Sequence, residues 1–152
     1  DTVRTLQRQV RELISSARLT MDGRTLRQAL EASVEEFARS SRCVFSLDNR
    51  LPGNCLPVDS ELQVLQIVRE ALANVVRHSH ARQVHIRLWP TASGWEVEVC
   101  DDGIGLPGDL PDSGHFGLSI MRERAAAIDA ELSVEALQNR SGTRVHLRWS
   151  RP

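Results

Sequence analysis

Lysine and tyrosine are absent from this sequence of 152 residues, and there are only three cysteines. Without lysine the chain has no P-loop and no Schiff-base or lysine general-base chemistry, because each of these needs an amine side chain. Cys43, Cys55 and Cys100 form no CxxC pair, which argues against a disulfide framework and structural zinc and fits a reducing compartment. No apolar run approaches the roughly 20 residues of a membrane helix. The net charge of −1 gives no overall field that would attract nucleic acid or an anionic membrane.

The length suits one domain with a real core, and its hydrophobic periodicity predicts both helices and strands. Apolar residues at helical spacing predict helices over residues 1–20, 26–41, about 60–79 and 118–128, with Asp59 or Ser60 capping the third. Alternating residues predict strands over 83–89, 95–101, 131–137 and 143–149, in two hairpins, with a shorter strand over 43–47. This order predicts an α+β two-layer sandwich, with helices on one face of a mainly antiparallel sheet.

The third predicted helix places four polar side chains, Glu70, Asn74, Arg77 and His78, on the side opposite its valines and leucines. Mg²⁺ takes oxygen ligands, often one or two from the protein and the rest from water and phosphates. Asn74 offers one such oxygen, Glu70 could hold a metal-bound or nucleophilic proton, and Arg77 could touch phosphate. A plain solvated helix face is the alternative, since exposed polar stripes are the usual case.

The sequence DDGIGLP follows the strand predicted over 95–101. It places the Asp101 carboxylate at a strand end, with Gly103 and Gly105 free to adopt positive φ beyond it. An ionised carboxylate only accepts hydrogen bonds, so it suits the exocyclic amine of adenine and opposes the carbonyl of guanine. An ordinary Asp-Gly turn is the alternative on this motif alone.

Two further glycine motifs follow. In GHFGLSIMRERA, Gly114 and Gly117 flank a helix start, whose free N–H groups form a ready anion site. In SGTRVHLRW, Gly142 and Thr143 begin a strand. Taken singly, the first is also compatible with a flexible loop before a helix and the second with a hairpin turn.

The order of these four motifs resembles the N box and the three glycine boxes of the Bergerat-fold ATPases, the superfamily of gyrase, MutL and histidine kinases. REALANVVRHSHA, DDGIGLP and GHFGLSIMRERA together resemble sensor histidine kinases with a short ATP lid. RELISSARLT, LRQALEASVEEF and LQIVREALANVVRHS are similar to the nitrate/nitrite sensor kinases, so the resemblance covers nearly the whole chain. It implies a two-component signalling domain that binds ATP and Mg²⁺.

The resemblance also implies roles for individual residues. Asn74 would ligate Mg²⁺, and Glu70 would be a second polar contact or would activate the phosphate acceptor. Asp101 would bind the adenine amine, and Thr143 would lie beneath the base. The remaining expected site residues would make room for the base (Gly103, Gly105), lie near the phosphates (Arg77, His78) or let the lid close (Gly114, Gly117). Asp102 stands where many kinases have Asn, a departure that should be tolerated because this side chain need not face the base. The lid over 106–116 is short, so the groups that hold the γ-phosphate are undefined.

None of the five histidines suits the role of phosphate acceptor, which in histidine kinases lies on a separate helical hairpin. The resemblance implies that residues 1–20 are the end of that dimerisation helix and that 21–152 are the catalytic domain. It further implies a response-regulator receiver domain as partner, a homodimeric full-length protein, and a cytoplasmic position below a bacterial inner-membrane sensor.

Two other readings stay open. In a clamp-type ATPase Glu70 would activate water, but such proteins carry a second domain that donates a lysine to the phosphates. A non-catalytic interaction module would keep the nucleotide site without turnover. The fate of bound nucleotide distinguishes all three.

Overall fold

The structure, a computed structural model, describes residues 2–3, 5–6, 23–53, 55–105 and 117–152. The lid expected over 106–116 and most of the helix expected over 1–20 lie outside the described residues. In chain order the elements are α2 (Leu26–Arg39), β1 (Val44–Asn49), α3 (Val58–Asn74), the π-helix η1 (Val75–Ser79), β2 (Gln83–Pro90), β3 (Gly94–Asp101), α4 (Leu118–Ala127), β4 (Glu131–Ala136) and β5 (Thr143–Ser150). No helix within these ranges is long and apolar enough to cross a bilayer.

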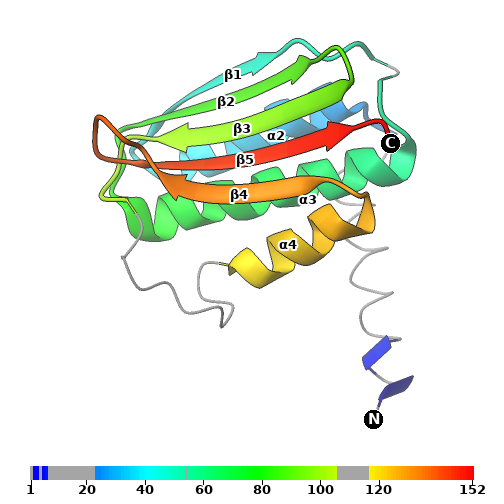
Figure 1. Cartoon of the computed structure of the whole chain (residues 1–152). Helices are drawn as coiled ribbons and strands as arrows, with labels where there is room; N and C mark the ends of the chain where they lie inside the picture. The colour runs from blue at the N-terminus through cyan, green and yellow to red at the C-terminus, as the bar shows by residue number, and fades with distance from the viewer. Residues whose placement is uncertain (1, 4, 7–22, 54, 106–116) are drawn as a thin grey trace.

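The molecule has two layers. Its five strands form one sheet in the order β1-β2-β3-β5-β4, and α2, α3 and α4 lie next to one another on one face of that sheet (Figure 1). All neighbouring strands are antiparallel except β1 and β2. The predicted α+β sandwich with a mainly antiparallel sheet is therefore confirmed.

The strand alternation decides which face of the sheet the helices cover. Val84, Ile86 and Leu88 point toward the helices and are fully buried, as the alternation of β2 predicts. On the opposite face the carboxylate of Glu98 lies between the guanidinium groups of Arg87, at 3.1 Å, and Arg144, at 2.8 Å. The charged residues of the strands thus pair with one another on the open face, and the apolar residues form the core against the helices.

Strand β1 differs from the prediction of a strand over 43–47. It runs over Val44–Asn49 and pairs with β2 in parallel, with Val44 opposite Gln83 and Asn49 opposite Leu88. Asp48 and Asn49, predicted to begin the loop, are therefore in the strand. Backbone pairing with β2 extends the strand, because it outweighs the tendency of Asp48 and Asn49 to form turns.

The third helix differs from its prediction at both ends. Neither Asp59 nor Ser60 caps it: the N-cap is Pro57, with no side-chain cap, and Asp59 lies in the first turn. The ring of Pro57 fixes its backbone φ near the value of a helix start. The negative charge of Asp59, in the first turn, interacts favourably with the positive end of the helix dipole. At the other end the α-helix stops at Asn74 and continues as the five-residue π-helix, in which the Ser79 hydroxyl donates to the Val75 carbonyl at 2.8 Å.

Candidate functional site

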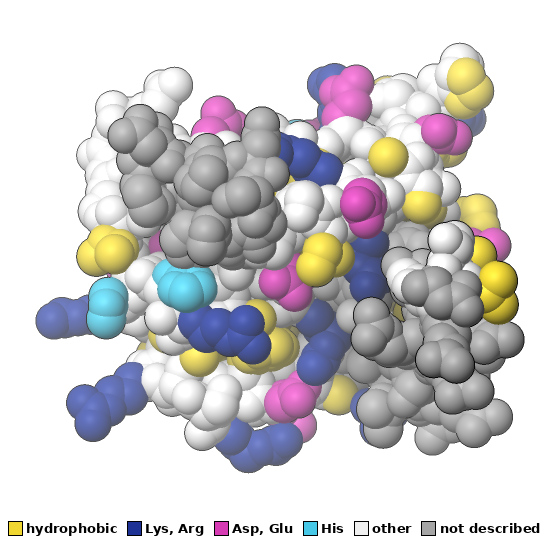
Figure 2. Space-filling model, turned by 90° about the horizontal axis from the view of Figure 1, so that it is seen from below, with side chains coloured by type: hydrophobic (Ala, Val, Ile, Leu, Met, Phe, Trp, Pro, Cys, Tyr) yellow, Lys and Arg dark blue, Asp and Glu magenta, His cyan; other side chains and the backbone are white. Residues whose placement is uncertain are grey.

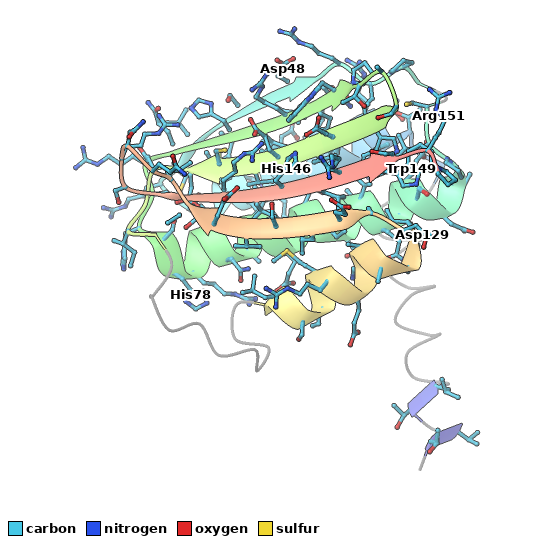
Figure 3. All side chains as sticks on the ribbon, in the orientation of Figure 1. Asp48, His78, Asp129, His146, Trp149 and Arg151 are labelled. Atoms are coloured by element: carbon cyan, nitrogen blue, oxygen red, sulfur yellow. The ribbon has the colours of Figure 1, made fainter. Side chains whose placement is uncertain are left out.

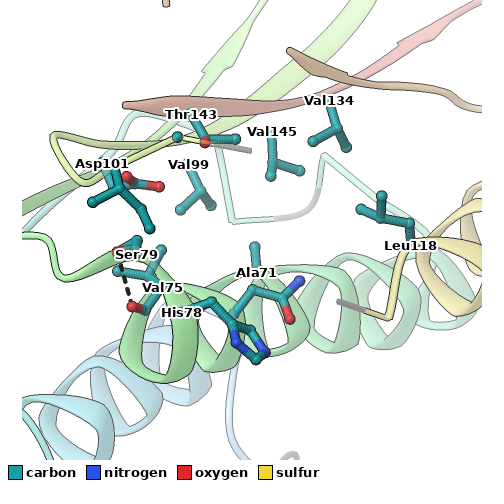
Figure 4. Close-up of a pocket in the computed structure, with 13 residues that line it drawn as sticks. Ala71, Val75, His78, Ser79, Val99, Asp101, Leu118, Val134, Thr143 and Val145 are labelled. Carbon is teal, nitrogen blue, oxygen red and sulfur yellow. Dashed lines mark hydrogen bonds between the residues drawn. The ribbon is translucent and has the colours of Figure 1, made fainter. Parts of the chain in front are cut away.

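A cavity of about 180 Å³ lies between α3 and the sheet (Figure 4). On the sheet side its wall is a row of valines, Val134, Val145 and Val99, which are adjacent in register on β4, β5 and β3. Ala71 and Val75 face this row from the helix side. A slot with apolar walls and a few polar groups is typical of small-molecule sites, and its two facing walls suit a flat ring.

Asp101 is the acidic group of this cavity. Its side chain ends β3 and is buried, and the Gly103 N–H donates to its Oδ1 at 2.9 Å. Burial raises the pKa of Asp101 above its ordinary value, and the backbone N–H groups of Gly103 and Thr143 partly oppose this rise. A carboxylate here accepts hydrogen bonds from a ligand, and the exocyclic amine of adenine is such a donor.

The backbone around Gly103 leaves no space for a side chain. A Cβ on Gly103 would lie 2.2 Å from the carbonyl oxygen of Ser79, at the end of the π-helix. The neighbouring Asp102 points away from the cavity, and its Oδ1 accepts from the backbone N–H groups of Arg82 at 2.8 Å and Gln83 at 3.0 Å. Asp102 therefore holds the start of β2 by hydrogen bonds and does not line the cavity.

Four other predicted residues line the same cavity: Asn74, His78, Gly105 and Thr143. Thr143 is buried and lies opposite Asp101 in the β3–β5 register. His78 projects from the end of the helix layer, below the sheet (Figure 3). With Leu118 of GHFGLSIMRERA, the fold thus brings residues from all four predicted motifs to one cavity. Asn74 and Thr143, which share this cavity, are 69 residues apart in the sequence.

The position of Asn74 corrects the helical-wheel prediction. That prediction placed Asn74 opposite the apolar side of the helix, but Asn74 lies with Ala71 and Val75 in the cavity wall and is half-buried. A helical wheel gives the angle of a residue about one axis and not the elements that pack beside it. Here α4 packs along α3, and the cavity is lined by residues of α3, of the start of α4 and of the sheet.

The remaining predicted residues lie around the cavity and not in its wall. Glu70 is half-buried, and its carboxylate lies against Gly117, the N-cap of α4. Gly117 has a positive φ of 65°, and a Cβ on it would be 1.9 Å from Glu70 Oε1. Arg77 is exposed on the π-helix. In the view from below the sheet, basic and histidine side chains gather toward one end of the molecule (Figure 2). Gly114 lies outside the described residues.

Sequence reasoning missed the apolar side chains that shape the cavity. Besides the valine row these are Ala71, Val75, Ile104 and Leu118. The alternation of the strands assigned the valines to the core. It did not indicate that these three valines line a cavity in place of packing against helix side chains. The signal lay in the buried strand positions next to Asp101 and Thr143, which share their face of the sheet.

The oxygen donors fit a magnesium ion held largely by a nucleotide. Among the described residues no group of three or more His, Cys, Asp or Glu side chains could hold a metal by themselves. The amide of Asn74 in the cavity wall provides one neutral oxygen. Mg²⁺ commonly takes one or two protein ligands and completes its shell with phosphates and water, so this donor set suits the ion when it arrives with ATP.

Comparison with known proteins agrees with this geometry. A family model described as histidine kinase-, DNA gyrase B- and HSP90-like ATPase matches residues 59–152. The nitrate/nitrite sensor protein NarX of Escherichia coli K12 is 36% identical over 137 residues, 90% of this chain and 23% of NarX. The histidine-protein kinase/phosphatase UhpB of Salmonella typhimurium is 33% identical over 138 residues, 90% of this chain and 27% of UhpB. The chain thus spans about a quarter of the length of these relatives.

Solved structures share the fold. The histidine kinase domain of the blue-light activated kinase of Erythrobacter litoralis has a TM-score of 0.70 at 23% identity and covers 90% of this chain and 70% of its own. The ATP-binding domain of PrrB from Mycobacterium tuberculosis has a TM-score of 0.62 at 24% identity and covers 81% of this chain and 91% of its own. Because the family model matches more than half of the chain, this protein belongs to the histidine kinase-, DNA gyrase B- and HSP90-like ATPases, as an ATPase domain related to sensor histidine kinases.

Proposed function

We propose that this chain is the catalytic domain of a sensor histidine kinase, which binds Mg-ATP and transfers the γ-phosphate to a histidine on a separate helical hairpin. In that step a P–N bond forms on the histidine, the bond between the β–γ bridging oxygen and the γ-phosphorus breaks, and ADP leaves. The observation that carries the proposal is the shared cavity wall of Asn74, Asp101 and Thr143.

In this proposal the cavity binds the base and the open edge receives the phosphates. The Asp101 carboxylate accepts from the adenine amine, and Thr143 lies beneath the ring. Asn74 ligates Mg²⁺, which neutralises charge on the phosphates when bound. Glu70, half-buried beside the start of α4, is a second polar contact or activates the acceptor. The other proposed contacts are phosphate neighbours (Arg77, His78) and glycines that admit the base or the lid (Gly103, Gly105, Gly114, Gly117).

The phosphate acceptor is proposed to lie outside this domain. His85 and His146 are on the open face of the sheet, where His85 Nδ1 is 2.5 Å from Ser46 Oγ and His146 Nε2 is 2.5 Å from Glu96 Oε1. That face is opposite the cavity, so neither ring can meet a γ-phosphate bound there. His78 and His80 belong to the π-helix and its C-cap.

The wider protein follows from the relatives. We propose that residues 1–20 end the dimerisation helix that carries the acceptor in a homodimer, and that 21–152 form the catalytic domain. The phosphate then passes to an aspartate of a response-regulator receiver domain. Similarity to NarX, named a nitrate/nitrite sensor protein, supports nitrate or nitrite as the signal and a cytoplasmic position below an inner-membrane sensor.

Acid-labile labelling from γ-labelled ATP tests this function. The chain by itself should bind ATP and gain no phosphohistidine, because phosphoryl transfer needs an acceptor held in line with the γ-phosphate. The dimerisation hairpin, supplied covalently or in trans, should restore labelling, and Asn74→Ala should abolish it. Strong labelling of the chain alone would contradict the proposed position of the acceptor.

The same assay addresses the two alternatives. A clamp-type ATPase would release inorganic phosphate without any acceptor, and an interaction module would bind nucleotide without turnover. The relatives favour the kinase over the clamp-type ATPase, because NarX is named a sensor protein and UhpB a histidine-protein kinase/phosphatase.

A further inference from the structure

The peptide group between Gly103 and Ile104 is held from both sides by distant parts of the chain. Its carbonyl, that of Gly103, accepts a hydrogen bond from the hydroxyl of Ser141, in the turn between β4 and β5. Its N–H, that of Ile104, donates to the carbonyl oxygen of Ser79 at 2.7 Å, at the end of the π-helix. One peptide plane therefore joins the sheet side of the cavity to the helix side.

This peptide plane bears directly on Asp101. The N–H of Gly103, on the preceding peptide, donates to Asp101 Oδ1 at 2.9 Å, so the orientation of the loop fixes which carboxylate lone pairs remain for a ligand. The turn that carries Ser141 also lies against the loop, because a Cβ on Gly142 would be 2.0 Å from the carbonyl oxygen of Asp101. The turn is closed by its own hydrogen bond, from Leu137 N–H to the Gly142 carbonyl at 3.1 Å.

We propose that Ser141 is a positioning residue for base recognition: its hydroxyl holds the Gly103 carbonyl and so keeps the Asp101 carboxylate directed at the adenine amine. Ser141 is itself exposed and does not line the cavity, so it acts through the loop and not by contact with the base. This inference rests on the proposed ATP-binding role of the same site.

A purely structural role would have a different signature. If Ser141 only tied the turn to the protein body, its removal would lower stability and weaken binding of every nucleotide equally. In either case the loss of one hydrogen bond lowers the melting temperature by a few degrees, roughly 2–4 °C. If Ser141 also positions Asp101, its removal should in addition weaken adenine binding selectively. Loss of the hydrogen bond between the adenine amine and a misdirected Asp101 carboxylate corresponds to about a 2- to 10-fold loss of affinity.

The test is titration calorimetry of Mg-ADP and Mg-GDP with the full chain and three variants. Ser141→Ala should weaken ADP binding about 2- to 10-fold, reduce the preference for ADP over GDP, and speed amide exchange of Ile104. Ser141→Thr keeps a hydroxyl and should restore the affinity. Ser133→Ala is the matched control, because Ser133 is exposed on β4 of the same hairpin and lies on the face away from the cavity.

Each outcome bears on the inference. An unchanged ADP-to-GDP preference in Ser141→Ala, with wild-type binding intact, would overturn the positioning role and leave the proposed function standing. Equal losses in Ser141→Ala and Ser141→Thr would also overturn it. A wild-type chain that binds no Mg-ADP would refute the proposed function, and this inference with it.

Discussion

Replacing Gly103 by alanine should damage both stability and nucleotide binding. The new Cβ would lie 2.2 Å from the carbonyl oxygen and 2.8 Å from the carbonyl carbon of Ser79, whereas ordinary contacts begin at 3.4 Å. Both atoms are backbone, so they cannot rotate away, and the loop must move by about 1 Å. Ser79 cannot yield freely, because its side chain is bonded to the Val75 carbonyl and the residue is buried.

The magnitude follows from two losses. Overpacking of this kind costs about 1–3 kcal/mol. The shift also breaks the hydrogen bond from Ile104 N–H to the same Ser79 oxygen, a loss of about 0.5–1.5 kcal/mol. Together they lower the free energy of unfolding by about 2–4 kcal/mol, or the melting temperature by roughly 5–15 °C for a chain of this size. Because Gly103 N–H also orients Asp101, ADP affinity should fall by at least about tenfold.

Gly53→Ala is the matched control. A Cβ on Gly53 would meet no atom within 4 Å, and the φ of this residue lies outside the left-handed region. Its stability should equal that of the wild type or exceed it by about 0.4–1 kcal/mol, because alanine reduces the freedom of the unfolded chain. Thermal denaturation and ADP titration of both variants check this. If Gly103→Ala matches Gly53→Ala in both measurements, the close contact with Ser79 is not a constraint on this loop.

Four other substitutions probe the core and the site. Leu72→Ala should cost about 2–5 kcal/mol of stability because Leu72 is fully buried. Asn74→Ala should spare stability and weaken only the Mg²⁺-dependent part of nucleotide affinity; equal stability losses in chemical denaturation would contradict these positions. Burial raises the pKa of Asp101, so its stabilising contribution is greatest below the ordinary pKa of 3.8 and is lost as the pH rises through the folded-state pKa. Asp101→Asn should therefore raise the melting temperature at pH 7 while weakening ADP binding; a lower melting temperature would argue against a desolvated carboxylate. Gly117→Ala forces alanine to φ 65° and to within 1.9 Å of Glu70 Oε1, so calorimetry should show weaker ATP binding than in the wild type.

The sequence by itself determined the parts of the fold that depend on local pattern. Period-two alternation located β2, β3, β4 and β5 to within about one residue and identified the buried side of each strand. Because Asp101 ends one such strand and Thr143 begins another, two of the cavity residues followed directly from strand ends. The order of the motifs then indicated the family, which the comparison with known proteins shows.

Tertiary contacts decided the rest, because a local pattern does not contain the neighbours of a segment. Parallel pairing with β2 extended β1 to Asn49 across residues that favour a turn. The packing of α4 along α3 places Asn74 in a cavity wall, next to apolar residues from which the helical wheel had separated it. The hydrogen bonds to one peptide group next to Asp101 join Ile104 to Ser79, 25 positions away, and Gly103 to Ser141, 38 positions away. Contacts at such separation form only when the whole chain is folded, so only the three-dimensional structure reveals how the acidic group of the site is fixed.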